Sequence, residues 1–330
     1  MRVAQASTAG GGAPEQEDLA KGAHTLAASL RGNLERVIRG QRDSLDLLLC
    51  AVAAGAHVLL EDIPGTGKTT LAKALAVSMG GVFKRVQFTP DLLPTDIVGA
   101  PIFHPQDATF HFKPGPVFAN VLIADEINRA SPRTQSALLE ALSEGQVTVD
   151  GELHPLPDPF LCIATQNPIE FHGTYPLPEA QLDRFGVQLA LGYPTEDEEK
   201  NILQAQRGRH PLADLSAITT TTALIDWQRA VEGVAMEDSV SDYLLRIVHA
   251  TRGHASVRLG VSTRGALLFA RLARARAFLA GRDYVLPDDL KALAAPALGH
   301  RLVLDARARY SGIDKQALVR DVVKSVPVPR

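Results

Sequence analysis

Short apolar segments and helical patterns alternate between residues 58 and 191. We expect strands at 58–60, 82–87, 121–124, 160–165 and 187–191, because these segments are apolar and too short for helices. Other apolar residues recur every three or four positions and predict helices around 26–37, 45–52, 71–79 and 131–142. Strands that alternate with helices are typical of an α/β fold with a mostly parallel sheet.

After residue 193 the pattern is helical throughout. Helices are expected around Ile225–Val231, Asp238–His249, Thr263–Leu279 and Asp288–Leu298. We therefore divide the chain into a disordered leader (1–24), an α/β core (25–192) and a smaller all-α domain (193–330) hinged near Tyr193-Pro194. The first residues are rich in Ala, Gly, Ser and Gln and lack an apolar segment, so we interpret them as disordered and not as a signal peptide.

Composition narrows the class of protein. The 330 residues are 45% hydrophobic and 22% charged, which is ordinary for a globular protein. A net charge of −3 argues against nonspecific binding of nucleic acid by the whole chain. Cys50 and Cys162 lie in separate apolar segments, as buried reduced thiols would, and no apolar run approaches the ~18 residues of a membrane span. We expect a cytoplasmic protein.

The segment 58–70 is the strongest chemical signal. An apolar run ends at Pro64-Gly65, Thr66 and Gly67 precede Lys68, and Thr69 and Thr70 open a helical pattern. Backbone N–H groups of such a turn bind phosphate at the helix N-terminus, with the lysine on the terminal phosphates and Thr69 on Mg²⁺. The usual pattern has glycine where this chain has Asp62, and aspartate tolerates left-handed backbone better than most residues.

Two carboxylates follow the strand 121–124. Asp125 and Glu126 would lie at its C-terminal end, which in an open α/β sheet faces the ligand. We predict that Asp125 holds Mg²⁺ and that Glu126 is the general base for an attacking water. The alternative is a solvated acidic strand end, which the upstream Gly-Lys-Thr disfavours.

Two further positions are candidates for nucleotide contact. Asn167 follows the strand 160–165 and could orient water near the terminal phosphate, although a lone asparagine there is more often a turn residue. The break between the first two helices contains Gly40 and Gln41, and a contact with the nucleotide base and a plain interhelical turn are equally good interpretations of it.

These motifs together resemble the AAA+ ATPases, and among them the MoxR family, over about residues 30–305. The resemblance is most specific in the stretches 88–94, 115–141 and 173–185. It implies an α/β fold with an AAA+ P-loop NTPase core and mostly parallel sheet, followed by a smaller all-α lid domain. Phe171-His172 departs from the Gln-Glu-like pair that we expect at that place.

The resemblance also implies roles that spacing alone does not. Arg184 matches the arginine finger that enters a neighbouring subunit's site, Asn167 matches the first sensor, and Arg264 matches a lid arginine that touches the γ-phosphate of its own subunit. It implies ATP and Mg²⁺ as ligands and a ring, usually a hexamer. A client protein of unknown identity and a partner with a von Willebrand factor A domain are implied as well.

We therefore expect an ATP-hydrolysing ring that remodels or matures protein complexes. A nucleic-acid motor of the same superfamily is an alternative, but it needs a basic, aromatic hairpin, and the candidate inserts 103–113 and 147–156 are rich in histidine, proline and acids. A slow nucleotide-dependent switch is another, which the full set of catalytic residues disfavours. A small-molecule phosphotransferase is least favoured, because no second substrate site stands out.

Overall fold

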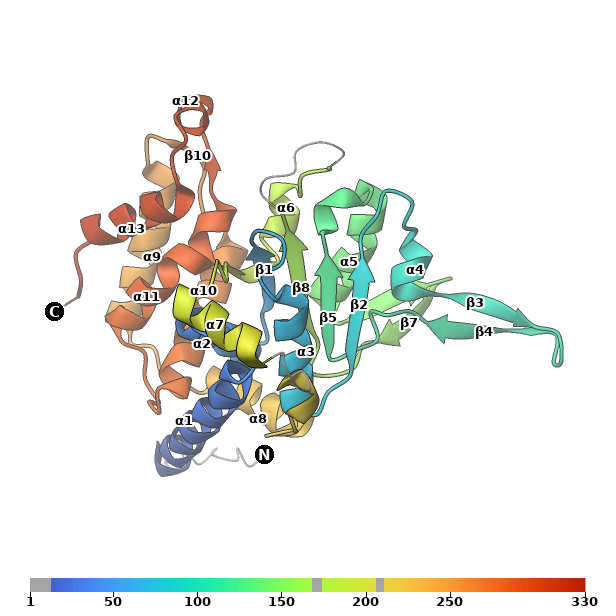
Figure 1. Ribbon diagram of the computed structural model, residues 1–330. Coiled ribbons are helices and arrows are strands. Elements are labelled where there is room, and N and C mark those ends of the chain that lie inside the picture. Colours follow the sequence, from blue (N-terminus) through green and yellow to red (C-terminus); the bar gives the residue numbers. More distant parts are fainter. Residues whose placement is uncertain (1–12, 168–173, 206–210, 330) are drawn as a thin grey trace, which may run out of the picture.

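A computed structural model describes residues 13–167, 174–205 and 211–329. Its centre is a five-stranded sheet in the order β2-β5-β8-β1-β9, and every neighbouring pair is parallel (Figure 1). The strands are β1 (His57–Glu61), β2 (Phe83–Gln87), β5 (Val121–Asp125), β8 (Leu161–Gln166) and β9 (Phe185–Leu189). All five predicted strands are present, and β9 begins two residues before the predicted start because Phe185 is itself fully buried.

Alternating side chains of each strand enter two apolar clusters. On β1, Val58 and Leu60 enter one cluster and Leu59 enters the other, as the twofold repeat of a strand requires. The first cluster includes residues of α1 (Ala13–Glu35), α2 (Arg42–Ala53) and α3 (Lys68–Ser78). The second includes residues of α4 (Pro94–Val98) and α5 (Pro132–Glu144). Both faces of the sheet are therefore covered, which explains the continuous apolar runs.

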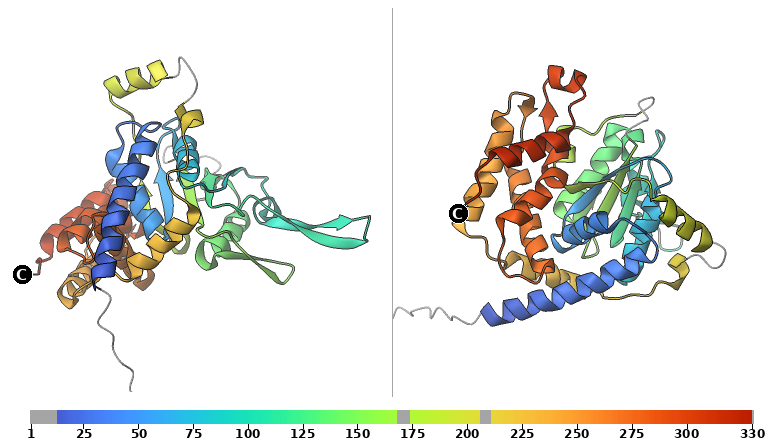
Figure 2. Two further views of the ribbon diagram at one scale, coloured as in Figure 1. Left: turned by 90° about the horizontal axis from the view of Figure 1, so that it is seen from below. Right: turned by 60° about the vertical axis from the view of Figure 1, so that its left-hand side comes forward.

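Two hairpins extend from the second face. The longer one, β3 (Gly99–His104) with β4 (Thr109–Pro114), projects well beyond the body of the protein (Figures 1 and 2). The shorter one, β6 (Gln146–Val149) with β7 (Glu152–Pro155), turns at Asp150 and Gly151, both in left-handed backbone, so the predicted hairpin is confirmed. The Phe112 and His154 rings stack with centroids 3.9 Å apart, which joins the hairpins.

The rest of the described chain is largely helical. Helices α7 (Glu196–Ala205), α8 (Thr221–Glu232), α9 (Asp238–Gly253), α10 (Thr263–Leu279), α11 (Pro287–Leu298), α12 (Ala306–Tyr310) and α13 (Lys315–Ser325) follow the core. The short elements are η1 (Ile127–Arg129), α6 (Glu179–Leu182), η2 (Pro211–Asp214), β10 (Val257–Leu259), η3 (Gly299–Arg301) and β11 (Val303–Leu304). Within the described ranges, no helix has the length and apolar character needed to cross a membrane.

The helical part shares the core of the sheet domain. Gln228 of α8 donates to Val52 O, Cys50 donates to Leu272 O of α10, and one apolar cluster runs from α1 to α13. The composition change at residue 193 therefore does not mark a separate core.

The predicted leader is too long. Helix α1 begins at Ala13, so residues 13–24, which we expected to be disordered, are helical. The helix packs through small residues, Ala20, Ala23 and Ala27, which carry little of the hydrophobic signal that we used. Residues 1–12 lie outside the described residues.

Candidate nucleotide site

The turn between β1 and α3 has the geometry of an anion-binding loop. Gly65 and Gly67 have φ values of 85° and 89°, which glycine adopts without strain, and Lys68 is the first residue of α3. Phosphate bound here would meet backbone N–H groups and the positive end of the helix. Lys68 Nζ lies 2.6 Å from Asp62 O, and partial burial lowers the pKa of its ammonium against the opposing effect of three nearby carboxylates.

Asp62 holds this loop by a mechanism that the sequence did not suggest. Its backbone is not among the left-handed residues, so tolerance of that conformation does not explain why aspartate stands here. Its buried carboxylate accepts from Leu191 N at 2.8 Å, Gly192 N at 2.9 Å and Ile63 N at 2.8 Å. Asp62 therefore ties the phosphate loop to the end of β9, where the chain leaves for the helical part.

Lys68, Glu126 and Asn167, three of the predicted catalytic residues, line one cavity of about 410 Å³ beside this loop. It is lined by Pro64, Gly65, Gly67, Lys68, Thr69, Thr70, Arg85, Gln87, Asp125, Glu126, Thr165, Gln166 and Asn167. The loop and the C-terminal ends of β2, β5 and β8 thus meet at one edge of the sheet. The nearby pair Phe171-His172 lies outside the described residues.

Both carboxylates of the cavity are held by hydrogen bonds. Asp125 Oδ1 accepts from the Thr165 hydroxyl at 2.6 Å, and Thr165 Oγ1 in turn accepts from Glu126 N at 2.9 Å. Glu126 has a φ of 55°, a left-handed conformation that is uncommon outside glycine and clusters at functional sites. Glu126 Oε2 lies 2.9 Å from Arg129 Nε.

Strand β2 contributes two side chains that we did not predict. Arg85 Nη2 lies 2.7 Å from Asp125 Oδ2, and Gln87 Nε2 donates to Glu126 Oε2 at 2.7 Å. The signal was present: two polar residues alternate at the end of a strand whose neighbour ends in carboxylates.

A second cavity of about 260 Å³ adjoins the first and shares Gly65, Gly67 and Thr70 with it. It is lined by Arg36, Val37, Ile38, Arg39, Gln41, Gly65, Thr66, Gly67, Thr70, Gly192, Pro194, Ile202 and Pro211. The break between α1 and α2 therefore faces the loop, as the base-contact interpretation expects. Gly40 itself does not line the cavity, because it faces Glu198 of α7, which a side chain at Gly40 would strike.

The two predicted arginines lie elsewhere. Arg184 and Arg264 line a third cavity of about 320 Å³, which has no lining residue in common with the phosphate cavity. Arg184 directly precedes β9, at the N-terminal edge of the sheet, whereas the phosphate loop follows β1 at the C-terminal edge. Five strand residues separate these edges, roughly 16 Å at about 3.3 Å per residue. Arg264 is thus not placed to touch the γ-phosphate of its own chain, contrary to our expectation.

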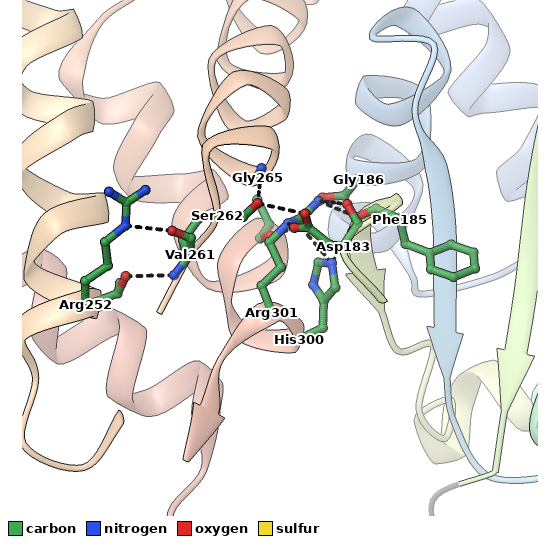
Figure 3. A network of polar contacts seen from close by, with 11 residues as sticks. Asp183, Phe185, Gly186, Arg252, Val261, Ser262, Gly265, His300 and Arg301 are labelled. Carbon is green, nitrogen blue, oxygen red and sulfur yellow. Dashed lines mark hydrogen bonds and ion pairs between the residues drawn. The ribbon is translucent and has the colours of Figure 1, made fainter. Parts of the chain in front are cut away.

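A polar network joins the two chain segments that contain these arginines (Figure 3). The Asp183 carboxylate accepts from Ser262 Oγ at 2.7 Å and from Arg301 Nε at 3.0 Å. Ser262 also caps α10 by accepting from Gly265 N at 2.9 Å, and Arg301, only 5% exposed, donates to Phe185 O at 2.6 Å. Asp183, the residue before Arg184, is therefore bonded to the N-terminal end of α10, where Arg264 lies.

The phosphate cavity fits a hydrated Mg²⁺ ion. The Thr69 hydroxyl and the Asp125 carboxylate are the hard oxygen ligands that Mg²⁺ takes together with water and phosphate oxygens. The described residues contain no cluster of three or more His, Cys, Asp or Glu side chains that would hold a metal alone. Metal bound here would depend on the nucleotide.

Comparisons with known proteins agree with this geometry. The model of the ATPase family associated with various cellular activities (AAA) matches residues 57–187, and that of the AAA lid domain matches residues 249–322. YeaC, an uncharacterized protein of Bacillus subtilis, is 49% identical over 95% of this chain and 97% of its own length.

Chaperone MoxR1 of Mycobacterium tuberculosis is 40% identical over 95% of this chain and 85% of its own length. Among solved structures, the crystal structure of a suggested ATPase from Cytophaga hutchinsonii matches with a TM-score of 0.88 and 35% identity. That match covers 96% of this chain and 99% of the other.

Proposed function

This chain belongs to the MoxR family of AAA+ ATPases, and from that premise we propose that it hydrolyses ATP at the boundary between subunits of a ring and uses the cycle to remodel partner proteins. One observation carries the proposal: Lys68, Asp125 and Glu126 line a single cavity beside the phosphate loop. A ring-forming ATPase of this family would be a hexamer, the size that we propose.

The predicted residues of the phosphate cavity each have a task in hydrolysis. The loop N–H groups and Lys68 bind the phosphates, while Thr69 and Asp125 hold Mg²⁺, which screens phosphate charge. Asn167 orients a water and Glu126 accepts its proton as the water oxygen bonds to the γ-phosphorus. The bond from that phosphorus to the bridging oxygen breaks, and ADP and phosphate leave.

The N-terminal edge of the sheet serves the neighbouring subunit. Arg184 and Arg264 line one cavity, and the segments that contain them are joined by the bond between Ser262 and Asp183, so we propose that both act in trans on the phosphates of an adjacent subunit. Positive charge near the γ-phosphate stabilises the transition state of phosphoryl transfer. This revises the cis role that the family pattern implied for Arg264.

The partner class follows from the family. We propose a partner with a von Willebrand factor A domain and a client protein that binds the ATP-loaded ring. A nucleic-acid motor has less support, because the hairpin segment 146–155 contains neither lysine nor arginine and 99–114 contains only Lys113.

Mg²⁺-dependent ATP hydrolysis tests the proposal. Specific activity should rise with protein concentration as rings form, and mass photometry should show the assembly over the same range. Lys68→Ala should abolish nucleotide binding and turnover, whereas Glu126→Gln should keep ATP bound and lower turnover about 10²- to 10⁴-fold. Turnover that survives both substitutions would refute the assigned site.

The client can be sought with the same variant. A pulldown with Glu126→Gln in ATP should retain ring, nucleotide and client together, and the Lys68→Ala protein is the matched control that cannot load ATP. Proteins captured equally by both variants would not be clients of the ATP-loaded ring.

A further inference from the structure

The phosphate cavity contains a cation with no assigned task. Arg85 is the central residue of β2, and its register partner is Ile123, two residues before Asp125. Its side chain is 49% exposed and lies 2.7 Å from Asp125 Oδ2. Lys68 and Arg85 are the two cationic residues among the described residues that line this cavity.

The ion pair with Asp125 competes with the proposed function of that carboxylate. Asp125 Oδ1 already accepts from Thr165, and Oδ2 is taken by Arg85. A Mg²⁺ ion bound at Oδ2 would stand beside the guanidinium, and two cations that share one carboxylate oxygen repel each other. Loading of Mg²⁺ and nucleotide therefore requires Arg85 to move from Asp125 to another anion.

The charge of the site identifies that anion. A triphosphate brings more negative charge than Lys68 can balance, and two carboxylates stand beside it. The lid arginine Arg264 lines a different cavity, so it does not compensate for this charge from within the subunit. A guanidinium binds phosphate oxygens through two parallel N–H groups and keeps its charge at any working pH.

We propose that Arg85 binds the terminal phosphate of ATP held by its own subunit, and that its ion pair with Asp125 is the nucleotide-free arrangement of the site. The inference rests on the proposed function, because it presumes that ATP occupies this cavity. Arg85 thereby distinguishes ATP from ADP: only the triphosphate offers an anion at the position where Asp125 meets β2. In the ADP state the guanidinium returns to the carboxylate.

Nucleotide binding measured by calorimetry tests this without recourse to turnover. We would titrate a non-hydrolysable ATP analogue and ADP, each with Mg²⁺, into the wild-type protein, Arg85→Ala, Arg85→Gln and Lys84→Ala. Lys84 is the matched control, because it is the neighbouring exposed cation on β2 and points to the opposite face of the sheet. Lys68→Ala serves as the variant that weakens both nucleotides.

Arg85→Ala and Arg85→Gln should bind the triphosphate at least about tenfold more weakly, the loss typical of one charge-assisted contact, and ADP within about threefold of wild type. Lys84→Ala should match the wild type for both. Equal losses for the two nucleotides, or no loss for either, would overturn the inference while leaving ATP binding intact. A wild-type protein that binds neither nucleotide would refute the proposed function itself.

Discussion

The cationic side chains at the two edges of the sheet differ in whether a carboxylate pairs with them. At the C-terminal edge Arg85 pairs with the Asp125 carboxylate, Arg129 pairs with the Glu126 carboxylate, and Lys68 donates to a carbonyl. At the N-terminal edge Arg184 and Arg264 line one cavity, and the carboxylate beside them is taken by other groups.

The positive charge at the N-terminal edge is therefore less well compensated than the positive charge at the C-terminal edge. Burial and the like charge of Arg264 lower the pKa of Arg184, with Glu144 opposing. Arg184 Nη1 donates to Leu139 O at 2.6 Å, whereas its buried Nε finds no acceptor among the described residues. Two guanidinium groups side by side are unfavourable until an anion joins them. The contrast agrees with our proposal that one edge receives the nucleotide and the other supplies the charge that a neighbour's nucleotide needs.

The largest predicted effect comes from mixing two inactive variants. Glu126→Gln and Arg184→Ala should each lower turnover by about 10² or more, for different reasons. In a mixed ring, a boundary that pairs the intact Glu126 of one subunit with the intact Arg184 of the next is complete. Random assembly of equal amounts makes about one boundary in four complete, so ATPase activity should reappear on mixing.

The control for this experiment is a mixture of Glu126→Gln with Lys68→Ala. Both changes damage the phosphate cavity, so every subunit of the mixed ring has a defective site. No boundary is complete, and activity should stay absent. If the Arg184→Ala mixture also stays inactive, the two edges do not meet across a subunit boundary.

Arg264→Ala should have the next largest effect. If Arg264 acts in trans, turnover should fall about tenfold to a hundredfold, because one charge near the transition state is lost, while ADP affinity of the altered subunit stays within about twofold. Arg229→Ala on α8 is a matched control, since Arg229 is 76% exposed and pairs only locally with Asp226. A loss of nucleotide affinity equal to the loss of turnover would show that Arg264 acts at its own subunit's site.

The two edges also differ in how much of each could be predicted from the sequence. The C-terminal edge was largely predictable, because Lys68 and Asn167 follow strands, Asp125 ends one, and parallel strand ends meet at one edge. The N-terminal edge was not, because the contact of Ser262 with Asp183 spans 79 positions and no local pattern records it. Asp62 shows the same limit: its partners Leu191 and Gly192 lie far along the chain.

Ser262→Ala tests how the N-terminal edge is held. The substitution removes the cap of α10 and one bond to Asp183, so we expect a stability loss of about 1 kcal/mol and a severalfold fall in turnover. Ser262→Thr keeps the hydroxyl and should restore both. In a double-mutant cycle with Arg184→Ala the losses in turnover should not add, because the network acts through that arginine. Full additivity would mean that Ser262 only stabilises the helix.

Asp62→Asn tests the tie at the C-terminal edge. Asparagine retains one acceptor oxygen but loses the charge that receives three backbone N–H groups, so the free energy of unfolding should fall by about 1–2 kcal/mol. ATP and ADP should both bind a few times more weakly, since the loop holds phosphates common to both. A selective loss of ATP would assign Asp62 the behaviour that we propose for Arg85.

The smallest effect is a pH dependence that originates at the N-terminal edge. Buried His57 at the start of β1 is 2.9 Å from Leu142 O through Nε2, and its Nδ1 accepts from Cys162 N, so the neutral ring is required. Burial lowers the pKa of His57 to about 4 from an ordinary 6.5. The unfolded chain therefore binds more protons between these pH values, and stability falls as pH drops through 6.5 towards 4.

The shift amounts to a loss of about 0.8 kcal/mol at pH 6 relative to pH 7.5. His57→Gln can keep both hydrogen bonds without titrating, so urea unfolding at the two pH values should show a smaller difference for the variant than for the wild type. Burial also lowers the pKa of His300, which destabilises in the same sense, and the difference between the two proteins removes that contribution. Because Leu142 also lines the arginine cavity, protonation of His57 should loosen that edge first. An identical slope in both proteins would show that the pH dependence originates elsewhere.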